Sequence, residues 1–327
     1  MNTLAQKALS AGITLVGGIV GSRVVAGGWR LVTGHSAPND AADETLPLIE
    51  ALSFAFISAG VAALLKVAGQ RGAGKTHLAN DPAKVAATMK PERFVDDTEE
   101  LVAWLRREFA QDKVFLLGTS WGSYVALKFA QRRPEWLHAY IGMGQAIDSP
   151  ESERRGYAYA LEHARRTGNR EAIAELESIA PYAQDGEPIP LEKIALERKW
   201  SDRFGGVMAY RESQVDGIAV RLSPEYSDDE AGRAYDGNGW SQDFLLSDVL
   251  GVQMGNETHL GCPLIVLAGR HDRSVNSQVA REWFDRVQAP SKHFEWFEHS
   301  AHEILAEEPG KLLLTLVQHA RPLAVGK

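Results

Sequence analysis

A serine between two glycines is the feature of this sequence whose setting most clearly predicts chemistry. Apolar residues Val114–Leu117 precede the motif Gly118–Gly122 (GTSWG), and an amphipathic pattern with helical spacing follows it. A G-x-S-x-G motif between a strand and a helix is typical of a nucleophile elbow, where flanking glycines leave room for a strained turn. The backbone N–H of Trp121 would then point toward the same place as the Ser120 hydroxyl and stabilise an oxyanion. The motif therefore predicts acyl transfer with Ser120 as the nucleophile.

A serine hydroxyl is a poor nucleophile alone and needs a base that an acid orients. Asp272 follows the strand-like segment CPLIVLAG, and two histidines, His299 and His302, follow the next strand-like segment, KHFEWF. The order serine, acid, histidine is the order of the hydrolase triad. We therefore expect Ser120, Asp272 and His302 to act together, with His299 as the alternative base. This chemistry requires no metal or cofactor.

The elements that must position these residues alternate between strand and helix patterns. We expect a hydrolase core formed by residues 70–145 and 256–327, in which apolar strands build a mostly parallel sheet. Residues 146–255 interrupt the alternation with mostly helical spacing, which predicts a helical lid between the two parts of the core. The expected fold class is α/β, with an inserted helical lid and an atypical apolar helical segment, residues 1–69, before the core.

Residues 70–321 resemble the α/β-hydrolase fold, and more narrowly the proline-iminopeptidase-like (S33-type) serine hydrolases. The motifs QRGAGKT, GTSWGS, AGRHD and SAHEILAEEP carry this resemblance. It implies Ser120 as nucleophile, Asp272 as acid and His302 as base, because Glu307 and Pro309 follow His302 at the family's spacing. It also implies cleavage of an N-terminal aminoacyl bond, with acidic lid residues holding the free amine of the substrate. Several glutamates fit that role, and the sequence does not choose among them.

The segment Gly69–Thr76 matches the phosphate-loop pattern G-x-x-x-x-G-K-[ST]. A phosphate loop needs a helix that starts at its Lys-Thr pair, but Pro82 interrupts a helix soon after Thr76. In the resembling family an aspartate commonly stands where this chain has Gly69, so the match arises from one replacement. We expect a structural turn here and no nucleotide as partner.

The first 69 residues depart from the resembling family, whose first strands and second oxyanion loop they do not match. Ala8–Trp29 and Leu46–Ala68 are apolar runs with helical character, and the segment weakly resembles short bacterial two-helix membrane proteins of unknown function. Inside each run the uncharged stretch is only about fifteen residues long, interrupted by Arg23 or bounded by Glu50 and Lys66, which is shorter than a full membrane span of about 20 residues. A soluble hairpin and a membrane contact through residues 8–69 both remain open, and the second is favoured. A missing second oxyanion donor would lower turnover by about a hundredfold to a thousandfold.

The composition of the chain limits the partners and the cellular compartment that we expect. The net charge of −8 gives no electrostatic reason to expect nucleic acid, and the single cysteine, Cys262, excludes an internal disulfide. We expect a cytoplasmic serine hydrolase, membrane-associated if residues 8–69 make that contact. It would cleave a small peptide or ester through an acyl-enzyme. The alternative is a membrane-associated fusion protein whose hydrolase part is a non-catalytic remnant or interaction module.

Overall fold

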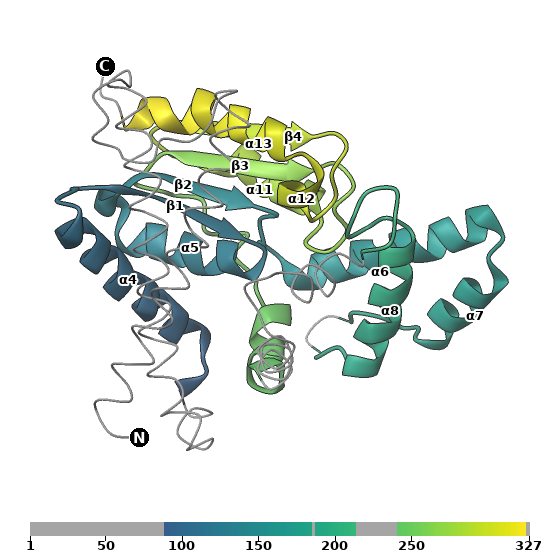
Figure 1. The fold of residues 1–327 in the computed structure, drawn as a ribbon. Coiled ribbons are helices and arrows are strands. Elements are labelled where there is room, and N and C mark those ends of the chain that lie inside the picture. The colour runs from purple at the N-terminus through teal and green to yellow at the C-terminus, as the bar shows by residue number, and fades with distance from the viewer. Residues whose placement is uncertain (1–87, 185–186, 214–240, 325–327) are drawn as a thin grey trace, which may run out of the picture. The chain divides into compact units, whose positions relative to one another are not determined.

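The structure, a computed structural model, describes residues 88–184, 187–213 and 241–324. Almost all of these residues belong to one compact unit of the chain, which is described below (Figure 1). The expectations for residues 1–69, including the two apolar helices, lie outside the described residues. So does the expected turn at Gly69–Thr76.

A four-stranded parallel sheet forms the centre of this unit. Its strands are β1 (Val114–Thr119), β2 (Leu137–Met143), β3 (Leu264–Gly269) and β4 (Lys292–Phe297), in the order β1-β2-β3-β4. Parallel neighbours require crossover connections. The crossovers are α5 (Trp121–Arg132) between β1 and β2, a long helical insertion between β2 and β3, and α11 (Ser277–Arg286) between β3 and β4. The expected mostly parallel α/β sheet is confirmed.

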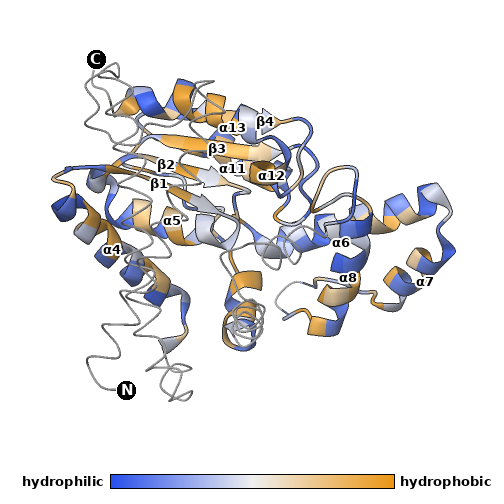
Figure 2. Cartoon of the chain, viewed as in Figure 1, coloured by the Kyte–Doolittle hydropathy of each residue, from blue (hydrophilic) through white to orange (hydrophobic). Residues whose placement is uncertain are grey.

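Helices cover both faces of this sheet (Figure 1). On one face α4 (Pro91–Glu108), α5 and α11 pack on the strands through side chains that include Val102, Phe129 and Trp283. On the other face lie α12 (Ile304–Glu307), α13 (Pro309–Thr315) and the turns η2 (Leu316–Ala320) and η3 (Arg321–Leu323). A strand buried on both faces has no polar side, and β3 (LIVLAG) is accordingly apolar throughout (Figure 2).

The insertion between β2 and β3 is helical in its described parts. It contains α6 (Ser149–Thr167), α7 (Arg170–Ser178), α8 (Leu191–Arg203) and helical residues 241–250. Side-chain oxygens of Asp148 and Asn169 accept backbone N–H groups at the starts of α6 and α7, and Gly168 ends α6 in the left-handed conformation. The helices α6, α7 and α8 share a small core of their own. The carboxyl ends of the strands point toward this insertion (Figure 1).

None of the helices in the described residues combines the length and the apolar character that crossing a membrane would need.

Candidate active site

Ser120 stands in a sharp turn between β1 and α5. Its backbone has φ 51° and ψ −126°, a conformation that few residues other than glycine adopt. The turn is held from both sides: Ser120 N–H donates to the Met143 carbonyl of β2 at 3.0 Å, and Ser123 N–H donates to the Ser120 carbonyl at 2.8 Å. The strain, the position after a parallel strand and the following helix are those of a nucleophile elbow.

The two glycines of the motif have different surroundings. A Cβ atom on Gly118 would lie 2.3 Å from the Gly122 carbonyl oxygen and 2.7 Å from the Ala126 Cβ, so the strand end can approach α5 only without a side chain. A Cβ atom on Gly122 would meet nothing within 4 Å in the described part of the chain. The expected steric need for glycine on both sides of Ser120 therefore holds here for Gly118 alone.

The N–H of Trp121 is placed to serve as a donor. Trp121 is the first residue of α5, and the first N–H groups of a helix have no intrahelical acceptor. Its side chain stacks on Tyr124 with ring centroids 4.8 Å apart and meets Phe94 edge-on. These aromatic contacts hold the Trp121 side chain against the first turn of the helix and against α4.

Asp272 and His302 form a buried hydrogen-bonded pair at the ends of β3 and β4. His302 Nδ1 lies 2.8 Å from Asp272 Oδ2, and Asp272 is 1% exposed. The other carboxylate oxygen, Oδ1, accepts the backbone N–H groups of Ser274 and Val275 at 2.8 and 3.2 Å. The loop after β3 thus orients the carboxylate, and the carboxylate orients the imidazole.

Charge and burial act in opposite directions on His302. Burial is the largest influence and favours the neutral ring, but the charge of Asp272 and its hydrogen bond outweigh it, and the pKa of His302 is raised above its ordinary value. Gly144, which follows β2 with φ +54°, stands directly against the ring. A Cβ atom there would lie 3.1 Å from His302 Cε1 and 3.2 Å from Nδ1.

The alternative base, His299, lies elsewhere. Its side chain is exposed, and its backbone N–H donates to Glu308 Oε2 at 3.0 Å. The structure therefore brings His302, and not His299, to Asp272. The Ser120–His302 hydrogen bond that a working triad requires is not among the contacts of the described residues.

Two residues of this site were not singled out for a role by the sequence. Glu307 was noted only as part of a motif, yet its carboxylate accepts N–H groups from both the His302 loop and the insertion. Gly144 is not part of any motif found in the sequence. The spacing of Glu307 after His302 is a signal that could have suggested a positioning role, whereas the closeness of Gly144 to His302 depends on the packing of β2 beside β3.

Comparison with known proteins identifies the class. Residues 69–309 match the family described as the alpha/beta hydrolase fold, and the chain belongs to this family. Its relatives place it among the S33-like α/β-hydrolases. It is 25% identical over 237 residues to the "Probable aminopeptidase YbaC" of Bacillus subtilis (strain 168), covering 72% of this chain and 73% of that protein. It is 26% identical over 238 residues to the "Proline iminopeptidase" of Clostridioides difficile (strain 630), covering 70% and 73%.

A solved structure is also similar to this chain. The proline iminopeptidase of Mycobacterium smegmatis matches with a TM-score of 0.49 and 15% identity over 75% of each chain. The first part of the sequence matches a different family: residues 6–78 fit the family model DUF4235, a protein of unknown function. This match agrees with the expectation that the N-terminal segment is distinct from the hydrolase core.

Proposed function

We propose that this protein is a serine hydrolase that cleaves an N-terminal aminoacyl bond through an acyl-enzyme, with Ser120, His302 and Asp272 as its triad. The observation that carries the proposal is the 2.8 Å contact between His302 Nδ1 and Asp272 Oδ2. It forms beyond the ends of β3 and β4, and β2 lies between β3 and β1, the strand that leads into the strained turn of Ser120. Ser120 N–H is bonded to Met143, and the next residue, Gly144, contacts the His302 ring. Nucleophile turn, base and acid are thus linked through the ends of neighbouring strands.

The proposed reaction follows from these positions. Ser120 Oγ attacks the carbonyl carbon while His302 Nε2 takes the hydroxyl proton, and Asp272 holds the Nδ1–H side of the ring and stabilises its positive charge. The Trp121 N–H binds the oxyanion that forms. His302 then gives the proton to the leaving group, which departs from the acyl carbon. A water molecule, deprotonated by His302, attacks the acyl-enzyme and releases Ser120.

The names of the relatives favour a substrate with a free N-terminus. The helical insertion holds two buried carboxylates, Glu153 and Glu197, which are 2% and 0% exposed. Arg198 bonds to both, and Tyr182 donates to Glu153 Oε2 at 2.6 Å. One oxygen, Glu197 Oε1, has no partner of normal geometry among the described residues. A substrate ammonium group is a cation that could satisfy this oxygen, so Glu197 is our candidate for amine recognition.

A test separates this function from a non-catalytic remnant. Wild type, Ser120→Ala, His302→Ala and His299→Ala are treated with a fluorophosphonate probe and assayed on aminoacyl anilides and simple aryl esters. We expect labelling to vanish in Ser120→Ala, activity to fall by at least about a thousandfold in Ser120→Ala and His302→Ala, and His299→Ala to stay close to wild type. A wild-type chain without labelling and without activity would favour the remnant.

The substrate class is tested with matched substrates. A peptide anilide with a free amine and its N-acetylated counterpart are compared in wild type and in Glu197→Gln. The proposal expects wild type to prefer the free amine and the variant to lose much of that preference. Equal rates on the two substrates in wild type would leave hydrolase activity in place and contradict aminopeptidase specificity.

We also propose that residues 8–69 contact a membrane, which rests on the two apolar runs in the sequence alone. Fractionation in high salt and then in carbonate, with a chain that starts at Gln70 for comparison, tests this. Identical soluble behaviour of both chains would contradict it.

A further inference from the structure

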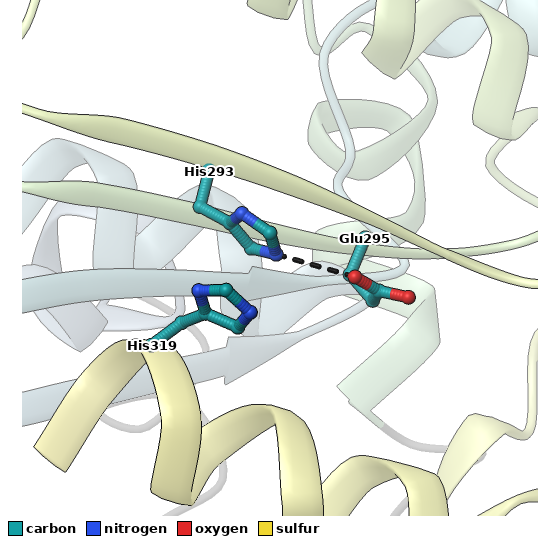
Figure 3. Close-up of side chains that lie close together, drawn as sticks. All are labelled: His293, Glu295 and His319. Atoms are coloured by element: carbon teal, nitrogen blue, oxygen red, sulfur yellow. Dashed lines mark hydrogen bonds and ion pairs between the residues drawn. The ribbon is translucent and has the colours of Figure 1, made fainter.

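Two histidines and a glutamate gather on the outer part of the sheet, away from the Ser120 turn. His293 and Glu295 belong to β4, and His319 belongs to η2, which packs on the same face of the sheet. One ligand atom from each residue lies within 4.8 Å of the others. Figure 3 shows the two rings and the carboxylate turned toward the same space between the strand and the C-terminal turns.

The alternation of the strand explains why the two β4 side chains share a face. Residues two apart on a strand point to the same side of the sheet, so His293 and Glu295 both face η2. Their side chains are 31% and 26% exposed, so an ion from solvent can reach them. The rings of His293 and His319 stack with centroids 3.6 Å apart and planes at 12°.

From this geometry we propose that His293, Glu295 and His319 form a binding site for a divalent transition-metal ion of the Zn²⁺ type. Two imidazoles and one carboxylate are ligands that zinc accepts, and a fourth position would be left to water. Tetrahedral zinc with ligand bonds of about 2.0–2.2 Å places its donors about 3.3 Å apart. The three donors must therefore move together by roughly 1.5 Å at most, which side-chain rotation can supply. One ring must also turn out of the parallel stack so that both nitrogen lone pairs face the ion.

Neighbouring side chains orient the Glu295 carboxylate. Glu295 Oε2 lies 3.2 Å from His293 Nε2, while its other oxygen, Oε1, is bonded to Lys311 Nζ at 2.8 Å. Lys311 can keep this bond and orient the carboxylate while Oε2 binds the metal, in the manner of an outer-shell partner. The ion would take the place of the contact between Glu295 Oε2 and His293 Nε2.

The ionisation states agree with this arrangement. Burial is the largest cause that lowers the pKa of His293 below its ordinary value, which favours the neutral ring, while the hydrogen bond to Glu295 opposes this shift. Burial is the largest single influence on Glu295 and acts to raise its pKa, but Lys311 and His293 together outweigh it, so the net pKa is lowered and the ionised carboxylate is favoured. Neutral imidazole and ionised carboxylate are the forms that bind metal.

The experiment uses the full-length, untagged chain after chelator treatment, with Zn²⁺ and Co²⁺ as the probes. Calorimetric titration with ZnCl₂ should give saturable binding of one ion, and Co²⁺ should give the visible absorption of a four-coordinate site. In His319→Asn and His293→Asn we expect the affinity to fall by more than about a hundredfold, since even outer-shell changes cost about 10–100-fold. His299→Asn, an exposed histidine outside the cluster, is the matched control and should bind as wild type does.

Thermal unfolding supplies a second measurement. Zinc should raise the unfolding temperature of wild type and of His299→Asn but not of the cluster variants, because an ion that binds only the folded state stabilises it. Should a histidine variant fail to fold, Glu295→Gln keeps the shape of the side chain and should still lose most of the affinity. Absence of saturable binding at millimolar Zn²⁺, or binding that all three cluster substitutions leave unchanged, would overturn the site. Neither result depends on hydrolase activity.

Discussion

Glu307 and Ala209 are joined by a hydrogen bond of 2.6 Å, which runs from the Ala209 N–H of the insertion to Glu307 Oε1. The other oxygen of the same carboxylate accepts the Ala301 N–H at 2.8 Å, one residue before His302. His302 N–H in turn donates to the Val207 carbonyl at 2.8 Å. A single turn of the insertion is therefore bonded to the loop that carries the proposed base, and Glu307 is the residue that joins them.

Glu307→Gln should impair turnover more than substrate binding. A glutamine amide has one acceptor and one donor end, so it cannot accept both N–H groups, and an unpaired buried N–H costs about 1–3 kcal/mol. We expect kcat to fall roughly tenfold to a hundredfold, with a smaller change in KM, because His302 is less well held. Glu298→Gln is the control, since exposed Glu298 pairs only with Arg270 in the described contacts. Equal kcat and KM values for Glu307→Gln and Glu298→Gln would contradict a positioning role for Glu307.

Gly144→Ala should reduce activity because of its contact with His302. The added Cβ would lie 3.1 Å from His302 Cε1, and the positive φ of +54° adds strain of roughly 1–2 kcal/mol. Gly168→Ala separates the two effects, because Gly168 also has a positive φ, +67°, but its Cβ would meet no described atom within 4 Å. We expect both variants to lose unfolding free energy through the strain at positive φ, Gly144→Ala at least as much as Gly168→Ala, and a fall in the rate of fluorophosphonate labelling in Gly144→Ala alone.

The pH dependence of kcat/KM should report the raised pKa of His302. His302 must be neutral to accept the Ser120 proton, so activity should fall as pH drops through this pKa, at a higher pH than for an ordinary histidine of about 6.5. Asp272→Asn removes the charge that raises the pKa. The acidic limb of its residual activity should therefore move to lower pH. An unchanged limb would show that another group controls the profile.

The sequence predicted the parts of this protein in which local pattern decides structure. The apolar run of β3 and the Gly118–Gly122 motif specify a buried strand and a sharp strand-to-helix turn, and both are present. Asp272 and His302 were chosen by chain order and motif, and the structure brings them together. The stacked pair His293 and His319 could not be predicted from the sequence, because this contact depends on how the C-terminal turns pack on β4.

Contacts between helices of the insertion could not be predicted from the sequence for the same reason. Helical spacing predicted α6 and α8, but no local rule places Glu153 of one helix beside Arg198 of the other. The sequence leaves open which glutamate of the insertion holds the substrate amine. The choice can be argued only once the burial of each carboxylate is known. Glu197 is fully buried, and its Oε1 has no partner of normal geometry among the described residues, which singles it out within the described insertion.

Glu197→Gln should reduce the loss of unfolding free energy that rising pH causes. Burial is the main cause that raises the pKa of Glu197 to about 7; nearby Glu153 adds to the rise, and Arg198 opposes it. Between the unfolded pKa, about 4.3, and this folded value the native state binds more protons than the unfolded state, so the free energy of unfolding falls as pH rises. The loss attributable to Glu197 is about 4 kcal/mol across this window and levels off above it. The variant lacks this titration.

Denaturant unfolding at about pH 5 and about pH 8 tests this prediction. The free energy of unfolding of Glu197→Gln should rise relative to that of wild type at the higher pH. Glu192→Gln, exposed on the same helix, is the control and should have the same pH dependence as wild type. A difference between Glu197→Gln and wild type that is the same at both pH values would show that Glu197 is ionised in the folded protein throughout, held by Arg198.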